Sequence, residues 1–367
     1  MELAGDVGIK GLGSYSLADR CSQTAFMASK RTFHNRAHRW GEAVPTLDHF
    51  FCQLLRTPTH TLAIASDGIG TKIEIAERCA NFATLGYDLV AMVADDIICC
   101  GAEPTHLSNI LDVDKLDAHI VSELFLGLTR AANEANMMIT GGETAELGNR
   151  IGGFGNGMHF NWCATALGIL PDHEKAIDGS AINEGDAVIS LQSCGLRSNG
   201  FSLARKILSA QFGEHWHREW FDREKTWGEQ LLTPSLIYAP HIVSLLQKKM
   251  PIAGIAHITG GGIAANFERI LSPWNKGAVL DSLCAPHEEM KCLQTLGSLS
   301  DRTCYETWNM GSGMLLVISP EHQERLLNEL RAKKLGAQVA GFVTSERAII
   351  IRSEARERLK LEFLYED

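Results

Sequence analysis

The sequence lacks the features that mark several classes of protein. No apolar run approaches the roughly 20 residues that a membrane-spanning helix needs, and residues 1–6 offer no basic stretch ahead of an apolar one, so we expect no secretory signal. Only 10 of 367 residues are proline and no tract has low complexity, so the chain is expected to fold throughout. Basic residues number 34 against 44 acidic ones, and the net charge of −10 argues against a nucleic-acid or anionic membrane surface. A local pocket for a small anion is compatible with this charge.

Paired cysteine motifs are also missing. The ten cysteines are scattered between positions 21 and 304 with no Cys-x-x-Cys spacing. This pattern favours buried free thiols in a reducing compartment over zinc ligands or disulfides. The sequence therefore predicts a cytosolic protein.

What is present indicates two domains of mixed structure. A chain of 367 residues is longer than one hydrophobic core usually serves. Short apolar runs that end in glycine clusters alternate with helical patterns, which is typical of proteins with both helices and strands.

The most informative motif is residues 66–72, Ser-Asp-Gly-Ile-Gly-Thr-Lys, directly after the apolar run 61–65. The glycines let backbone N–H groups approach an anion, Asp67 can hold a hard cation and Lys72 can neutralise polyphosphate charge. The Walker spacing Gly-x-x-x-x-Gly-Lys is absent. Taken alone, the motif fits a tight turn after a strand as well as a nucleotide site.

Carboxylates occur within an otherwise apolar helical stretch at residues 86–98. Asp88 and Asp95 are seven residues apart and share a face, with Asp96 adjacent. Buried carboxylates need a cation or hydrogen-bond donors, so metal binding and a solvated acidic face are both open interpretations.

A further acid follows the helix predicted over 117–136. The short strand 137–139 runs into residues 140–146, Thr-Gly-Gly-Glu-Thr-Ala-Glu. Glu143 could join Asp67 and Asp96 around one or more Mg²⁺ ions, which prefer carboxylate oxygen. The alternative is a polar turn with a helix-capping acid.

The second half contains two glycine-rich segments that each begin a helical run. Ser198-Asn-Gly200 precedes residues 201–212, and residues 256–262, Ala-His-Ile-Thr-Gly-Gly-Gly, precede a helix near 263. A helix N-terminus with glycines and small donors is the usual place for a phosphate. His257 could act as a general acid or base, or could be a structural residue at a strand end, and the glycines could be helix caps and turns alone.

Taken together, these segments resemble the aminoimidazole ribonucleotide synthetases, also called phosphoribosylformylglycinamidine cyclo-ligases. The matching segments occur in the family's order and cover roughly residues 61–352. They are residues 67–72, 86–92, Asp96 with 101–104, 141–146, 198–203, 231–234, 256–262 and 309–314.

The resemblance implies a two-domain PurM-like α/β (α+β) fold. Residues 1–170 would form an N-terminal ATP- and Mg²⁺-binding domain whose sheet pairs across a homodimer, with 1–60 as a divergent arm. Residues 171–367 would form a C-terminal α/β domain closing over the ATP cleft. The implied reaction uses ATP to activate the amide oxygen of formylglycinamidine ribonucleotide, after which an internal nitrogen closes the imidazole ring and ADP and phosphate leave. Phosphoryl transfer of this kind depends mainly on positioning and charge neutralisation.

The resemblance also assigns roles to individual residues. Asp67, Asp96 and Glu143 resemble the ligands of Mg²⁺–ATP, and Asp67, Lys72 and His257 are the implied catalytic residues, with Asp88 as a supporting acid. The implied nucleotide and substrate contacts are Asp67, Gly68, Gly70, Thr71, Lys72, Asp96, Gly141, Gly142, Glu143, Thr144, Ser198, Asn199, Gly200, Gly260, Gly261 and Gly262.

The sequence departs from the family's pattern at several points. The usual Tyr-Lys-x-x-Gly-Val arm is not recognisable in residues 1–60, Arg197 stands where a histidine is usual, and Asn161 replaces an aspartate. Two alternatives follow. The chain could be a superfamily member that uses ATP on another small molecule, or a degenerate dimer that binds a nucleotide without turnover. Selenophosphate synthesis would need a reactive cysteine context that Cys21 lacks.

Overall fold

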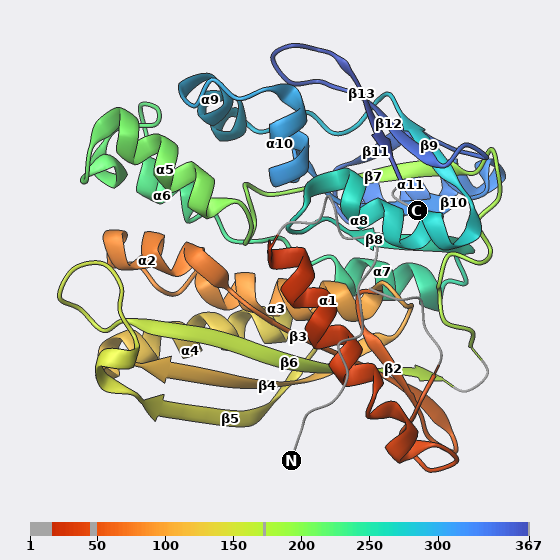
Figure 1. Cartoon of the computed structure of the whole chain (residues 1–367), viewed down its shortest axis with the longest axis horizontal. Helices are drawn as coiled ribbons and strands as arrows, with labels where there is room; N and C mark the ends of the chain where they lie inside the picture. Colours follow the sequence, from red (N-terminus) through yellow and green to blue (C-terminus); the bar gives the residue numbers. More distant parts are fainter. Residues whose placement is uncertain (1–16, 45–49, 172–173, 366–367) are drawn as a thin grey trace, which may run out of the picture.

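The computed structural model describes residues 17–44, 50–171 and 174–365, and the side chains of 17–20 and 22 are not described. Residues 1–16, the beginning of the predicted divergent arm, therefore lie outside the described residues. The described chain contains helices and strands in two halves, each built on its own sheet, which lie one above the other in Figure 1. The mixed α and β class predicted from the sequence is confirmed.

The first half is built on a six-stranded sheet with the order β1-β2-β3-β6-β4-β5. Its strands are β1 (Glu42–Ala43), β2 (Gln53–Arg56), β3 (His60–Gly68), β4 (Glu103–Val113), β5 (Met138–Glu146) and β6 (Phe160–Pro171). Its helices are α1 (Leu17–Lys30), η1 (Phe33–Arg36), η2 (Gly70–Lys72), α2 (Ile73–Cys79), α3 (Leu85–Ile98), α4 (Ala118–Glu134) and η3 (Gly148–Arg150). β4 and β5 pair in parallel, whereas the other neighbours pair antiparallel.

Helices α3 and α4 cover one face of this sheet. α4 begins at Asp117, whose carboxylate accepts the N–H groups of His119 and Ile120, and it buries an apolar stripe at helical spacing. The two helices approach so closely that a Cβ on Gly86 of α3 would lie 2.2 Å from the backbone nitrogen of Leu128 on α4. Only glycine permits this distance, and the tight packing fixes α3 beneath the sheet.

The opposite face of the sheet is only partly covered. Ile110 on β4 is 46% exposed. Apolar side chains of β3 and β6 on the same face are half-buried, namely Leu62, Ile64, Leu167 and Ile169. We call these five residues, Ile110 and the four half-buried ones, the open sheet face.

The second half is built on a seven-stranded sheet with the order β13-β12-β9-β11-β7-β10-β8. Its strands are β7 (Ala187–Gln192), β8 (Ile252–His257), β9 (Gly277–Leu280), β10 (Ser312–Ile318), β11 (Ala337–Thr344), β12 (Ala348–Arg352) and β13 (Lys360–Leu364). Its helices are α5 (Phe201–Phe212), η4 (Trp216–Arg218), α6 (Trp227–Leu231), α7 (Ala239–Gln247), α8 (Gly262–Leu271), η5 (Ser272–Trp274), α9 (Glu288–Leu296), α10 (Asp301–Thr307), η6 (Pro320–His322) and α11 (Gln323–Ala332).

Helix α3 joins the two halves through buried polar contacts. Asp95 Oδ1 accepts the N–H groups of Tyr238 and Ala239, both at 2.9 Å, and so caps α7, which has no side-chain cap from Tyr238, its own N-cap residue. Asp88 accepts the N–H and the hydroxyl of Ser235. The first half therefore supplies acceptors that the second half needs.

Among the described helices, none combines the length and the apolar character that crossing a membrane requires.

Candidate functional site

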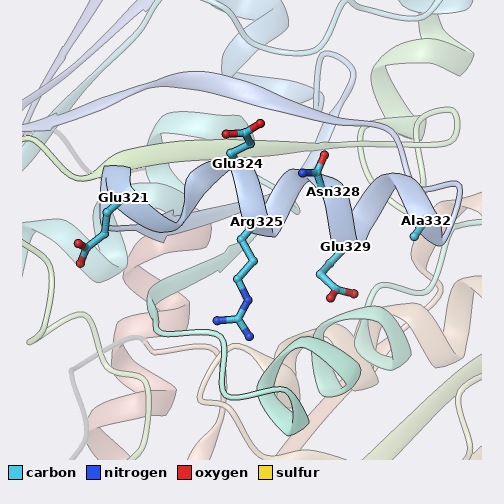
Figure 2. A pocket seen from close by; sticks show the side chains of 6 residues that line it. All are labelled: Glu321, Glu324, Arg325, Asn328, Glu329 and Ala332. Carbon is cyan, nitrogen blue, oxygen red and sulfur yellow. The ribbon is translucent and has the colours of Figure 1, made fainter.

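Two surface hollows lie apart from the predicted site residues. The larger, about 520 Å³, is lined by side chains of η6 and α11 alone, including Glu324, Arg325 and Glu329 (Figure 2). The other, about 340 Å³, lies between the end of α2, the start of α4 and residues 154–158. Neither hollow contains a residue that the sequence motifs singled out, so the motif residues lie outside both hollows.

Asp67 and Asp96 are two partly buried carboxylates, and the charge of Asp96 acts on Asp67. Asp67 lies at the end of β3 and accepts the N–H of Gly68 at 2.7 Å. Burial raises the pKa of Asp67 to about 6, and the negative charge of Asp96 adds to the increase. Burial likewise raises the pKa of Asp96 to about 7, although the charge of Arg269 opposes this. Two such carboxylates form a site that a cation would stabilise.

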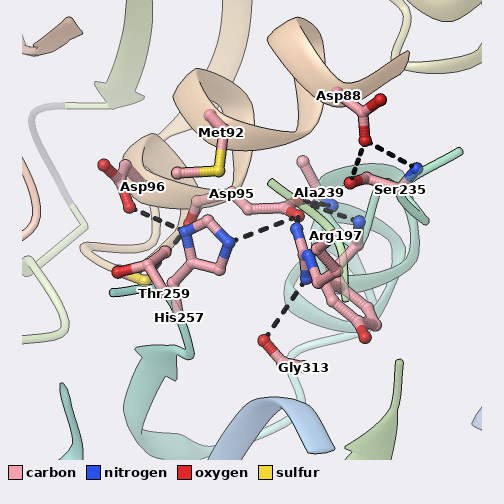
Figure 3. A network of polar contacts seen from close by, with 12 residues as sticks. Asp88, Met92, Asp95, Asp96, Arg197, Ser235, Ala239, His257, Thr259 and Gly313 are labelled. Carbon is pink, nitrogen blue, oxygen red and sulfur yellow. Dashed lines mark hydrogen bonds and ion pairs between the residues drawn. The ribbon is translucent and has the colours of Figure 1, made fainter. Parts of the chain in front are cut away.

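His257, at the end of β8, lies behind Asp96 and is fully buried (Figure 3). Burial, aided by the charge of Arg197, lowers the pKa of His257 to about 3, so the imidazole is neutral and Nδ1–H donates to Asp96 Oδ1 at 2.7 Å. Nε2 has no hydrogen-bond partner among the described residues and is 4.0 Å from Asp95 Oδ2. This geometry suits orientation of the Asp96 carboxylate.

Arg197 anchors the segment before Ser198. Its side chain is 1% exposed, and Nη2 donates to Asp95 Oδ2 at 2.8 Å while the guanidinium stacks over the Tyr238 ring. Its φ of 63° is unusual for a residue with a side chain. Where the sequence shows only a departure from the family pattern, the structure shows a buried ion pair that fixes the start of a glycine loop to α3.

Lys72 does not face the site in this structure. Its side chain is 0% exposed, and Nζ donates to Asp88 Oδ1 at 2.8 Å and to the Thr233 carbonyl oxygen at 2.7 Å. Burial lowers the pKa of Lys72 and raises that of Asp88, and each partner's charge opposes the other's shift. In this structure the ammonium of Lys72 is enclosed in an internal ion pair, and the phosphate contact expected of Lys72 stays a prediction.

The three glycine segments meet at one place. A Cβ added to Gly70 would lie 3.9 Å from the Ser198 carbonyl oxygen, and one added to Gly260 would lie 3.3 Å from Asn199 Oδ1. The hydroxyls of Thr71 and Ser202 are 3.3 Å apart. The structure thus brings together segments that lie 60 residues or more apart in the sequence.

These segments begin helices, and their free donors point to an anion. α5 begins after Gly200 and α8 after Gly261, both with left-handed φ and no side-chain cap. The first N–H groups of a helix lack acceptors within it. The Ser198 hydroxyl is buried and has no hydrogen-bond partner among the described residues. Such a cluster of donors is suited to phosphate oxygens.

Gly141, Gly142, Glu143 and Thr144 lie elsewhere, on the exposed edge strand β5. The register Asp67↔Ala164, Ala164↔Asn109 and Asn109↔Gly142 separates β5 from β3 by three strand spacings, about 14 Å. Glu143 aligns with Ile110, on the face opposite Asp67. Within the described residues of one chain no three metal-binding side chains gather, so Glu143 lies apart from Asp67 and Asp96, and the three-acid Mg²⁺ site stays a prediction.

Sequence reasoning missed two residues near this site. Asn266, fully buried on α8, bonds the backbone of the 259–262 loop. Arg269 lies near Asp96 and stacks over the ring of Phe51. A polar Asn among the apolar residues 263–267 was a usable signal for the first, whereas no sequence pattern indicated the second.

Solved structures with the same fold confirm the PurM-like architecture. One, described as "AaThiL complexed with AMPPCP and TMP", is 14% identical with a TM-score of 0.63 and covers 95% of this chain and 99% of its own. Another, hydrogenase maturation protein HypE in complex with ATP, is 18% identical with a TM-score of 0.57 and covers 97% of each chain.

Curated relatives are much closer in sequence. The phosphoribosylformylglycinamidine cyclo-ligase of Carboxydothermus hydrogenoformans is 36% identical over 79% of this chain and 83% of its own length. That of Pyrococcus furiosus is 35% identical over 83% of this chain and 85% of its own length. The model of the AIR synthase related protein N-terminal domain matches residues 51–170, and that of the C-terminal domain matches 183–353. The chain therefore belongs to the AIR synthase related protein family, as do these cyclo-ligases.

Proposed function

We propose that this chain is the ATP-dependent cyclo-ligase that converts formylglycinamidine ribonucleotide to aminoimidazole ribonucleotide in purine biosynthesis. The observation that carries the proposal is the meeting of three glycine segments beside the Asp67–Asp96 pair, in a chain about 36% identical to curated cyclo-ligases. ATP and a phosphoribosyl substrate both present phosphate groups, which such helix N-termini bind.

The residues at the site fit Mg²⁺ as well as ATP. Mg²⁺ is usually bound by one or two carboxylates together with water and substrate phosphates. Asp67 and Asp96 supply two carboxylates whose pKa values are raised chiefly by burial, which disfavours their charged form until a cation binds. When bound, Mg²⁺ would neutralise charge on the phosphates. Asp67 and Asp96 would hold it, while Ser198, Asn199, Gly200 and Gly260–Gly262 would bind phosphate oxygens.

His257 and Lys72 would support these ligand-binding residues from the protein interior. His257 would orient the Asp96 carboxylate through its Nδ1–H, in place of the proton transfer expected from the sequence. Lys72 would hold Asp88 and the Thr233 carbonyl, which keeps residues 233–235 against α3. Thr71, exposed beside Ser202, is the better candidate from its motif for a direct phosphate contact.

The proposed assembly is a cytosolic homodimer with a domain boundary after residue 170. The open sheet face, with Ile110 46% exposed, is the surface we assign to the second copy. Glu143 lies on that side of the sheet, so a site completed across the dimer is where it would act. All ten cysteines are free thiols, which supports a reducing compartment.

The decisive experiment incubates the protein with Mg²⁺, ATP and formylglycinamidine ribonucleotide and follows aminoimidazole ribonucleotide as a diazotisable amine. Product should depend on all three additions and should be lost in Asp67→Asn. A folded wild-type protein that binds ATP yet forms no product would contradict the proposal.

A further inference from the structure

A buried amide side chain lies behind the glycine-rich loop that begins α8. Asn266 is 0% exposed. Its Nδ2 donates to the carbonyl oxygen of Gly262 at 2.6 Å and to that of Gly260 at 3.1 Å, and lies 3.4 Å from that of Thr259. Its Oδ1 accepts the Thr259 hydroxyl at 3.1 Å. All of these contacts go to the segment 259–262, so the amide serves this loop.

The chemistry of the neighbours fixes the orientation of the amide. Three carbonyl oxygens surround one terminal atom of the side chain, and carbonyl oxygens only accept hydrogen bonds, so this atom is the nitrogen. Its two hydrogens serve the two shorter contacts, those to Gly262 and Gly260. The loop carbonyls therefore turn inward, towards α8.

Turning the carbonyls inward turns the N–H groups outward. In a planar trans peptide the N–H of the next residue points opposite to the carbonyl. Because the carbonyls of Gly260 and Gly262 face Asn266, the N–H groups of Gly261 and Ile263 point away from it. Gly261 has φ +88° and Gly262 has φ +71°, left-handed conformations that favour glycine and that set the direction of these N–H groups.

The outward surface of the loop faces the rest of the candidate site. Gly260 and Gly261 are exposed, and the position of a Cβ on Gly260 is 3.3 Å from Asn199 Oδ1. Thr259 lies beside His257 and Asp96 (Figure 3). On its inner side the loop is supported by Tyr305, whose carbonyl oxygen would be 1.9 Å from a Cβ on Gly262. Asn266 and Tyr305 thus hold the loop from behind.

We propose that Asn266 is the positioning residue that holds residues 259–262 as a phosphate-binding loop. Asn266 does not touch the ligand; it fixes the direction of the backbone N–H groups that do. The inference rests on the proposed function, which supplies two sources of phosphate, the nucleotide and the phosphoribosyl substrate. A residue that only filled its buried position would affect stability without affecting either ligand.

The test uses the full chain with Asn266→Ala and Asn266→Asp. The KM values for ATP and for formylglycinamidine ribonucleotide are measured separately, together with the affinities for ADP and ribose 5-phosphate by calorimetry. We expect about a tenfold increase in the KM and the dissociation constant of the ligand whose phosphate sits on this loop, the scale of one lost hydrogen bond to a charged group. The kcat should change less than about threefold. Asn266→Asp should have the larger effect, because its carboxylate faces carbonyl oxygens.

Matched variants separate positioning from stability. Gln294 on α9 is another buried amide, 1% exposed, which donates to Asp301 and to the Leu299 carbonyl. Gln294→Ala should lower the melting temperature as Asn266→Ala does and leave both KM values unchanged. Thr259→Ser keeps the hydroxyl that Asn266 accepts and should retain the wild-type KM, whereas Thr259→Val should raise it.

Each outcome decides the inference. A selective rise in one ligand's KM supports it and identifies whose phosphate the loop binds. Asn266→Ala with both ligands bound within twofold of wild type, at a temperature where the variant is folded, would overturn it, as would an equal KM increase in Gln294→Ala. If the wild type lacks cyclo-ligase activity, the proposed function fails, and calorimetry with ADP and ribose 5-phosphate still decides the role of Asn266. A wild type that binds neither compound would overturn it as well.

Discussion

The acids near α3 fall into two groups that differ in how their charge is compensated. Asp88 and Asp95 are 0% exposed, and each pairs with a buried cation and accepts backbone N–H groups. Among the residues that the structure describes, neither Asp67 nor Asp96 pairs with a buried lysine or arginine. Asp96 accepts a hydrogen bond from the neutral His257, and the charge of Arg269 acts on it. Their pKa values are raised to about 6 and about 7.

This difference separates structural acids, Asp88 and Asp95 on α3, from proposed functional acids, Asp96 on α3 and Asp67 at the end of β3. Buried ion pairs contribute little net stability but are costly to break from one side. Carboxylates with raised pKa values in a glycine-lined site lower their free energy when a cation arrives. Asp95 and Asp96 are adjacent in sequence, yet only the structure shows that they belong to different groups.

The largest effect is expected from removing the cation of the Lys72–Asp88 ion pair. Lys72→Met leaves the Asp88 carboxylate buried without its cation, which should lower the free energy of unfolding by about 3–5 kcal/mol. Urea unfolding measures this change. Replacing both residues, Lys72→Met with Asp88→Leu, should recover much of the lost stability, since no buried charge then remains. A double variant as unstable as the single one would show that the unpaired Asp88 carboxylate is not the cause of the loss.

The next largest effect is expected at Asp67 and Asp96, where substitution should weaken ligand binding without lowering stability. Asp96→Asn and Asp67→Asn should leave stability unchanged or increase it, because each removes a carboxylate that burial disfavours. Affinity for Mg²⁺–ADP should fall by at least about 10–100-fold, the loss seen even for outer partners of metal sites. Calorimetry with and without Mg²⁺ checks this. Equal loss without Mg²⁺ would count against a metal role.

The pH dependence of stability should also distinguish the two groups. The folded pKa values of Asp67 and Asp96, about 6 and about 7, exceed the unfolded values near 4. Between pH 4 and 7 the folded state therefore binds more protons, so these two groups lower the free energy of unfolding as pH rises through that window. We expect a contribution of about 1–3 kcal/mol after allowance for their partial exposure.

Thermal unfolding from pH 4 to 8 measures that contribution by comparison with Asp96→Asn, whose curve should be flatter. Mg²⁺–ADP should stabilise the wild type more at pH 8 than at pH 5.5, because metal binding needs deprotonated carboxylates. Parallel curves for wild type and variant would contradict the assignment.

The smallest effect is expected at Glu143. Its side chain is exposed on β5, so Glu143→Gln should change the free energy of unfolding by less than about 0.5 kcal/mol. Within one chain it should not alter Mg²⁺ affinity. A loss of Mg²⁺–ADP binding that appears only at concentrations where the protein is dimeric, followed by sedimentation, would place Glu143 in a site shared between copies.

The sequence predicted the fold, and it singled out segments that the structure brings together, but it did not reveal the contacts of their side chains. The alternation of apolar runs with glycine clusters, and the amphipathic stretch 117–136, led to the correct class and to α4. The glycine segments at 68–70, 198–200 and 260–262 were identified because local backbone requirements leave a local trace. Roles that depend on contacts with distant parts of the chain left no such trace in the sequence.

Lys72 illustrates the limit. Next to a glycine motif, lysine is as compatible with a phosphate contact as with an internal ion pair, and the choice is made by Asp88 and Thr233, 16 and 161 residues away. Glu143 illustrates a second limit. Its distance from Asp67 is set by the strand order β3-β6-β4-β5, which the periodicity of apolar residues in the sequence does not reveal. Arg197 adopts a left-handed conformation that no propensity would assign to it.

The capping of α7 by Asp95 has a consequence for how the chain can be divided. Family models separate it between residues 170 and 183. A cut there would remove the donors of Asp95 and the Ser235 donors of Asp88, and would leave the first N–H groups of α7 without the Asp95 acceptor. We therefore expect that the two regions matched by the family models do not fold independently. The chain should melt in a single cooperative transition, and neither half expressed alone should reach the stability that it has in the whole.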